Sequence, residues 1–301
     1  MARLIFQDRK SPVLSRPSLP CISMHYTINL TAGCVCRCKY CYAQGFRRNL
    51  PEGRIVFYHN SYKKLTREFR RKKSLPQIVF FSTACEPFAP FSPVLDETYK
   101  IMEFLLSWSV SIYLSTKGYI PDRFIKLYSR FPGKVFAQVG LTTVDDRTRK
   151  RFEPHAAPVA ARLNNIRRLL DAGVSTEARM DPLIPEVNDG DESLQRLFAR
   201  MKELGLGQAV ASYLFLRNSN TKPMVQALKG TGIKLNGYYS NKIDKYCSGG
   251  SIEIVYEAYR ESKYRTMVSM AAGNGVALKL CSCKNPGLTE NICHPKGQVK
   301  T

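Results

Sequence analysis

Three cysteines in one short segment are the side chains with the clearest chemical meaning. In GCVCRCKYCYA, Cys34, Cys38 and Cys41 follow the spacing C-x3-C-x2-C. Thiolate is the soft ligand that iron–sulfur clusters prefer, so three thiolates from one loop can each hold one iron of a 4Fe-4S cluster. The fourth iron then stays open to a small molecule, and Cys36 is expected not to be a ligand. The competing interpretation is a zinc site built on Cys38 and Cys41 with Cys34 or Cys36.

Further polar residues stand just after apolar, β-rich segments. Glu86 lies in FFSTACEP, Lys117 in LSTKG, and Thr142 and Thr143 in GLTTVDD. In parallel α/β sheets the carboxyl ends of the strands meet at one edge, where chemistry collects. These four side chains are therefore candidates for one site. Each also has an ordinary structural interpretation; for Glu86 it is a charge at the N-terminus of the next helix.

The order of these motifs resembles the radical S-adenosylmethionine (SAM) superfamily. Tyr40 stands just before the last cysteine, and the segments Arg151-Phe152-Glu153-Pro154 and Arg162-Leu163 follow further along the chain. Within the superfamily, the sequence is similar to the spore photoproduct lyase-like branch over about residues 24–215. The resemblance implies that the open iron binds the amino and carboxylate groups of SAM. It also implies that an electron from the reduced cluster cleaves SAM to methionine and a 5'-deoxyadenosyl radical.

The same resemblance implies roles for single residues around SAM. Glu86 would receive the amino group of SAM, as a charge-assisted contact, and Lys117 would meet its carboxylate. Thr142 or Thr143 would supply a hydroxyl. Tyr40 completes the expected cofactor-binding set.

Cys85 is the candidate catalytic residue. It stands where spore photoproduct lyase has the thiol that returns a hydrogen atom to the product radical, and a thiol S–H bond is weaker than an alkyl C–H bond. The alternative is a small buried filler, since cysteine is among the most buried residue types.

The activity that the resemblance implies is a DNA repair lyase that separates two methylene-bridged thymines. Two other hypotheses stay open: radical SAM modification of RNA or a peptide, and a non-enzymatic zinc-bound nucleic-acid-binding module.

A second group of thiols lies towards the end of the sequence. Cys281 and Cys283 are followed by Cys293 and His294, and Cys247 is available upstream. Four soft ligands from a loop-rich extension predict an auxiliary 4Fe-4S cluster or a structural zinc. Surface thiols without a metal are the third interpretation.

The elements that must position these residues follow from the hydrophobic pattern. Short β-rich runs alternate with segments of helical spacing, which predicts a partial (β/α)6 TIM-type barrel with a cysteine-containing C-terminal extension. We expect an N-terminal surface strap at 1–22, the barrel at 23–217 and the extension at 218–301, with one long helix at 252–270. The expected strands are Met24–Thr31, Gln77–Ser82, Val110–Ser115, Val135–Leu141, Val174–Met180 and Ala209–Phe215.

Charge and composition limit the classes of partner that the protein is expected to bind. The chain has 46 Lys and Arg against 24 Asp and Glu, a net charge of +22, which favours nucleic acid, with DNA preferred. No apolar run is long enough to span a membrane and no secretory signal is visible, so a cytoplasmic protein without a membrane partner is expected. A radical SAM enzyme also needs a reducing protein such as flavodoxin or ferredoxin.

Overall fold

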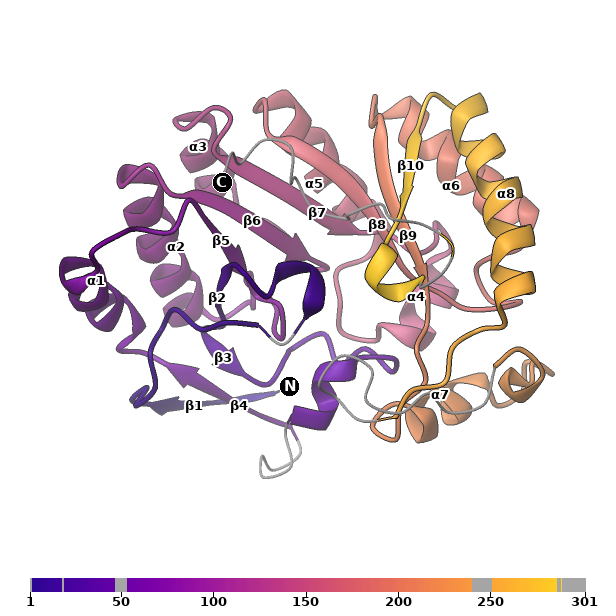
Figure 1. The fold of residues 1–301 in the computed structure, drawn as a ribbon, viewed down its shortest axis with the longest axis horizontal. Helices are drawn as coiled ribbons and strands as arrows, with labels where there is room; N and C mark the ends of the chain where they lie inside the picture. The colour runs from indigo at the N-terminus through magenta and orange to yellow at the C-terminus, as the bar shows by residue number, and fades with distance from the viewer. Residues whose placement is uncertain (1, 18, 47–52, 240–250, 286–287, 289–301) are drawn as a thin grey trace.

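A parallel sheet forms the centre of the molecule (Figure 1). A computed structural model describes residues 2–17, 19–46, 53–239, 251–285 and 288. Every neighbouring pair in the sheet is parallel. This confirms the partial TIM-type barrel. From one edge to the other, the seven strands are β10 (Ala277–Leu280), β9 (Gln208–Tyr213), β8 (Ser175–Leu183), β7 (Val135–Gly140), β6 (Ser111–Thr116), β5 (Ile78–Phe81) and β2 (Tyr26–Ile28).

Helices connect the strands and cover the sheet. α2 packs on β6, α5 on β7 and β8, and α8 on β10. The residues they bury share helical spacing: in the first helix, Leu65 and Phe69 are four positions apart and both are buried. The helices are α1 (Ser61–Arg71), α2 (Ser92–Ser107), α3 (Asp122–Ser129), α4 (Asp146–Phe152), α5 (Val159–Asp171), α6 (Asp191–Glu203), α7 (Thr221–Leu228) and α8 (Glu257–Gly273).

The N-terminal segment is more than a surface strap. Its strand β1 (Arg3–Gln7) pairs in parallel with β4 (Arg54–Tyr58), which also pairs with the two-residue β3 (Thr31–Ala32) in a small separate sheet. Val13 and Leu14 are 0% and 5% exposed and belong to the main hydrophobic core. The expectation that residues 1–22 lie outside the core is therefore wrong for these two side chains.

The six expected strands all occur, with shifted ends. The first is shorter than expected, because β2 ends at Ile28 and the chain then leaves the large sheet to form β3. The helix expected at 252–270 begins at Glu257, since residues 253 and 255 instead form β-bridges to Leu216 and Tyr239. The sequence did not predict β1, β4 or β10. None of the described helices combines the length and apolar character needed to cross a membrane.

Candidate active site

A cavity of about 280 Å³ lies at the carboxyl ends of the strands. Its lining includes all three cysteines of the C-x3-C-x2-C segment, together with Tyr40, Cys85, Glu86 and Lys117. The rule that strand ends converge therefore predicted this gathering correctly. Thr142 and Thr143 are the exception. Although both are buried just beyond β7, neither belongs to the lining that the structure describes.

The cysteine segment is a loop held against the end of α4. The backbone N–H of Lys39 donates to the carbonyl of Phe152 at 2.8 Å, and the N–H of Cys41 donates to the carbonyl of Cys38 at 3.1 Å. Gly33, at φ +97°, allows the chain to turn out of β3 into the loop. The loop therefore has a defined position relative to the strand ends.

Cys34, Cys38 and Cys41 line the cavity and have the soft thiolate chemistry that an iron–sulfur cluster takes. No three His, Cys, Asp or Glu side chains within the described ranges are arranged as the shell of one metal ion. A 4Fe-4S cluster does not require such an arrangement, because each thiolate binds a different iron and the sulfurs stand further apart. Cys36 is buried, and its Sγ lies 3.7 Å from Glu86 Oε2 as a hydrogen-bond donor. Cys36 also packs with Cys34 and Cys38, so its assignment as a non-ligand stays a prediction.

Glu86 is buried and saturated with hydrogen bonds. Its Oε1 accepts from Thr116 Oγ1 at 2.5 Å and from the N–H of Phe88 at 3.1 Å, and its Oε2 accepts from the N–H of Lys117 at 2.9 Å. Burial raises the pKa of Glu86, although these hydrogen bonds oppose the shift. A Cβ at Gly118 would lie 2.8 Å from Oε1, so only glycine allows this approach. For a SAM amino group to bind here, the contact with Cys36 would have to be displaced.

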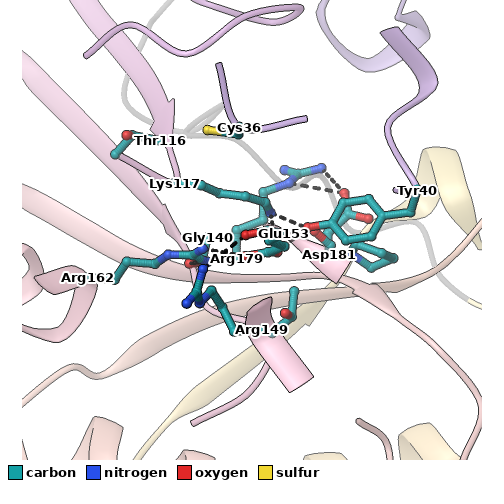
Figure 2. Close-up of polar contacts among 12 residues, drawn as sticks. Cys36, Tyr40, Thr116, Lys117, Gly140, Arg149, Glu153, Arg162, Arg179 and Asp181 are labelled. Carbon is teal, nitrogen blue, oxygen red and sulfur yellow. Dashed lines mark hydrogen bonds and ion pairs between the residues drawn. The ribbon is translucent and has the colours of Figure 1, made fainter. Parts of the chain in front are cut away.

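A buried carboxylate behind the cavity, Glu153, joins the cysteine loop to the strand ends (Figure 2). It is 1% exposed and accepts a hydrogen bond from the hydroxyl of Tyr40. It also forms ion pairs with Arg162 and, at 3.5 Å, with Lys117. Burial raises the pKa of Glu153, but Lys117 and Arg162 outweigh burial and hold this pKa below its usual value. Arg162 in turn donates to the carbonyl of Gly140 at 2.9 Å.

Lys117 therefore stands at the junction of two elements. Its Nζ lies near Glu153, 5.5 Å from the centre of the Tyr40 ring, and donates to the carbonyl of Asp181 at 3.3 Å. A Cβ at Gly140 would lie 2.7 Å from Lys117 Cγ, so the bare backbone of β7 makes room for this side chain. The motifs in the sequence include Glu153 and Arg162 but predicted no role for either. Glu153 follows the basic run Arg149-Lys150-Arg151, so nothing local marks it as a buried charge.

Cys85 lines the cavity and is 9% exposed. Its Sγ lies 3.5 Å from Asn29 Oδ1 and 3.6 Å from Ser82 Oγ. Burial raises the pKa of the Cys85 thiol, so the S–H form is favoured near neutral pH. A protonated thiol in the cavity wall is the form that can donate a hydrogen atom.

The C-terminal thiols are described only in part. Cys281 and Cys283 have their sulfurs 3.0 Å apart, and they pack with Cys21 and Val210. Cys283 also lines the cavity. Cys247, Cys293 and His294 lie outside the described residues, so an auxiliary cluster or zinc stays a prediction.

A partial parallel barrel whose open carboxyl edge carries a three-cysteine loop defines a class of enzymes that hold a metal cluster beside a strand-end cavity. The family model described as Radical SAM superfamily matches residues 28–198. The chain belongs to the radical SAM superfamily. This membership implies a 4Fe-4S cluster and SAM as cofactors.

Relatives and solved structures agree with this membership. An uncharacterized protein of Acidianus two-tailed virus is 20% identical over 74% of this chain and 78% of its own length. A radical SAM Nα-GlyT isomerase of Pseudomonas phage M6 is 23% identical over 92% of this chain, which spans 57% of the isomerase. Spore photoproduct lyase complexed with dinucleoside spore photoproduct superposes with TM-score 0.70 at 16% identity, covering 92% of this chain and 82% of the lyase. A variant of that lyase with bound AdoMet and the same dinucleoside gives 0.71, covering 92% and 81%. The two chains thus share one fold.

Proposed function

We propose that this protein is a radical SAM lyase of the photoproduct type that acts on nucleic acid, with DNA as the favoured substrate. The observation that carries the proposal is a single cavity that gathers the cysteine loop, Lys117 and the Cys85 thiol. The shared fold with a lyase bound to a dinucleoside lesion supports it, as does the net charge of +22.

The cysteine loop and the strand ends would bind different parts of the cofactors. Cys34, Cys38 and Cys41 would hold the cluster, and Lys117 would hold the SAM carboxylate. When bound, the two cofactors supply a 5'-deoxyadenosyl radical, which abstracts hydrogen from the substrate. Glu153 holds Lys117 and Tyr40 together from behind the cavity, so the loop and the strand ends keep one mutual position. We keep Thr142 or Thr143 as the expected hydroxyl contact, which a small movement beyond β7 would have to bring into the cavity.

Cys85 would return the hydrogen atom to the product. After the bond between the two thymines breaks, one carbon carries an unpaired electron. Transfer of the hydrogen atom from the Cys85 S–H forms a C–H bond at that carbon and leaves a thiyl radical on Cys85. The buried, protonated state of the thiol keeps this hydrogen available.

The test uses anaerobically reconstituted protein with SAM, dithionite and the spore photoproduct of thymidylyl-thymidine. We expect deoxyadenosine formation and conversion of the lesion to the repaired dinucleotide, both abolished in the Cys34/Cys38/Cys41 triple alanine variant. Cys85→Ala should keep SAM cleavage and lose clean repair, giving side products that chromatography separates. SAM cleavage by wild type without any repair would reject the lyase, and clean repair by Cys85→Ala would reject the donor.

The phage isomerase supports a second candidate, radical rearrangement of a modified substrate, because it aligns with 92% of this chain. On the dinucleoside spore photoproduct, which lacks the phosphodiester, a lyase releases two separate thymidines, whereas an isomerase yields a product of unchanged mass. Mass spectrometry of the products from this substrate therefore separates the two candidates. Transfer of deuterium into deoxyadenosine from RNA or from a peptide would indicate those substrates instead.

A further partner is an acidic electron-transfer protein of the flavodoxin or ferredoxin type. A second hollow of about 610 Å³ is also lined by Cys34, Cys38 and Cys41. Arg37, Lys39 and Arg54 line the same hollow. We propose that this basic hollow, the outer hollow, is where the reducing protein approaches the cluster.

A further inference from the structure

We infer that the cavity contains an anion subsite, formed by Arg179, Arg217 and Lys284, that binds a backbone phosphate of the substrate. This inference rests on the proposed nucleic-acid substrate and specifies how it is held. The three side chains come from β8, from the segment after β9 and from the C-terminal extension, and all three line the cavity.

The first reason for this anion subsite is the state of the Arg217 side chain. Its backbone is fixed, because its N–H donates to Asn220 Oδ1 at 2.9 Å and its carbonyl accepts from the N–H groups of Asn220 and Thr221 at 3.0 Å each. Its guanidinium group, by contrast, has no hydrogen bond or ion pair with any described residue. A positioned backbone with an unengaged guanidinium at a cavity wall is suited to a ligand anion, which arginine binds through two parallel N–H bonds.

The second reason is the surplus of positive charge on this wall. Arg179 donates to Asp181 Oδ2 through Nε at 3.1 Å, and Lys284 Nζ lies 2.5 Å from Asp181 Oδ1. Burial raises the pKa of Asp181, but Lys284 and Arg179 hold it well below its usual value, so this carboxylate stays charged. One carboxylate thus faces two cations, and Arg217 adds a third. Among the described residues of this wall, positive charges therefore exceed negative ones by two.

The three cations also lie close to one another. Lys284 Nζ is 5.4 Å from the centre of the Phe215 ring, which lines the cavity two positions before Arg217. Arg179 and Lys284 both pair with the Asp181 carboxylate, and Arg217 lines the same cavity. The SAM carboxylate is assigned to Lys117, beside the Tyr40 ring, so this wall is left for the substrate.

The test compares two ligands of the SAM-bound holoenzyme: the spore photoproduct of thymidylyl-thymidine, with its phosphodiester, and the dinucleoside spore photoproduct, without it. We expect wild type to bind the phosphodiester about tenfold more tightly, the effect of one charge-assisted contact. Arg217→Gln should lose most of this preference, and Arg217→Lys should keep more of it. Arg196→Gln, which removes an exposed charge from α6, is the matched control and should keep all of it.

Each result has a distinct meaning. Equal binding of both ligands by wild type overturns the subsite and leaves the proposed substrate standing. Binding of neither ligand by wild type overturns both. If Arg217→Gln weakens SAM binding while the preference for the phosphodiester persists, Arg217 serves the cofactor and the subsite is wrong.

Discussion

Glu153 is a carboxylate buried away from water. The described residues that form ion pairs or hydrogen bonds with its side chain lie in or directly behind the cavity wall. Arg162 is equally buried, Lys117 lines the cavity and Tyr40 belongs to the cysteine loop. Burial and the negative groups around it raise the pKa of Tyr40, so its hydroxyl stays protonated and donates to Glu153. One carboxylate thus fixes the distance between the loop and the end of β6.

Replacing Glu153 by glutamine should therefore be costly. The amide keeps the shape but leaves Arg162 buried without a counter-charge, and breaking one side of a buried pair costs about 3–5 kcal/mol. Urea unfolding at neutral pH measures this loss. In samples that remain folded, the iron content and the KM for SAM should also change, because Lys117 and the loop lose their common anchor.

The matched control is Glu103→Gln, which breaks a surface pair with Arg130 whose side chains are 41% and 59% exposed. That variant should lose no more than about 1 kcal/mol, the usual range for exposed pairs. Equal losses in the two variants would show that Glu153 has no special structural weight.

At the scale of elements, α4 orients Glu153. Asp145 caps its N-terminus by accepting from the N–H groups of Arg147 and Thr148. Asp146 accepts from Arg149 within the helix and from the N–H of Val159 at 3.1 Å, which ties α4 to the start of α5. Glu153 is the residue that follows this helix. The contacts of Asp145 and Asp146 therefore help to hold Glu153 in place.

These aspartates make the stability of the helix pair depend on pH. The Arg149 hydrogen bond lowers the pKa of Asp146 to about 2, below its value in the unfolded chain. The stabilisation is therefore complete above about pH 4 and is lost as the pH falls towards 2. Asp146→Asn should cost about 0.5–1 kcal/mol at pH 7, because the side chain is half exposed, and about a third of that at pH 2.5, where the carboxyl is partly protonated in the folded state. Urea unfolding at the two pH values measures the difference; an equal cost at both would exclude the charge as its source.

The sequence predicted those elements whose pattern is local. The six core strands are recognisable because each is a separate apolar run. Cys34, Cys38 and Cys41 are recognisable because their spacing within one short segment is characteristic. β10 was not recognised, because its four residues ALKL form only a short run and become a strand by pairing with β9. The polar contacts behind the site were missed for the same reason. Tyr40 and Glu153 are 113 positions apart, and Lys284 and Asp181 are 103 apart.

At the scale of the whole molecule, the cysteine loop lines two hollows, the cavity and the outer hollow. Both are also lined by basic residues, so each would attract the acidic partner proposed for it: nucleic acid at the cavity and the reducing protein at the outer hollow.

Reversing the charge of the outer hollow should affect only one of these partners. In a Lys39→Glu/Arg54→Glu variant, deoxyadenosine formation driven by reduced flavodoxin should fall about tenfold at low salt, because steering is lost. Formation driven by dithionite should stay within about twofold, because a small reductant needs no docking. The deficit should shrink as salt rises, since screening removes the attraction from wild type as well. Arg196→Glu on α6 is the control; a variant that fails with both reductants has a damaged loop rather than a lost docking surface.

The pairing of β10 with β9 has a consequence for synthesis on the ribosome. The last strand of the sheet is made from residues 277–280, and Lys284, a wall residue of the cavity, follows it. Until those residues emerge, β9 is an unprotected edge that can pair with another nascent chain. The cavity of such a chain also lacks one wall, although its cysteine loop was synthesised more than two hundred residues earlier. Cluster insertion before that point would therefore expose the iron to solvent, so the order of strands favours loading after residues 277–284 have emerged.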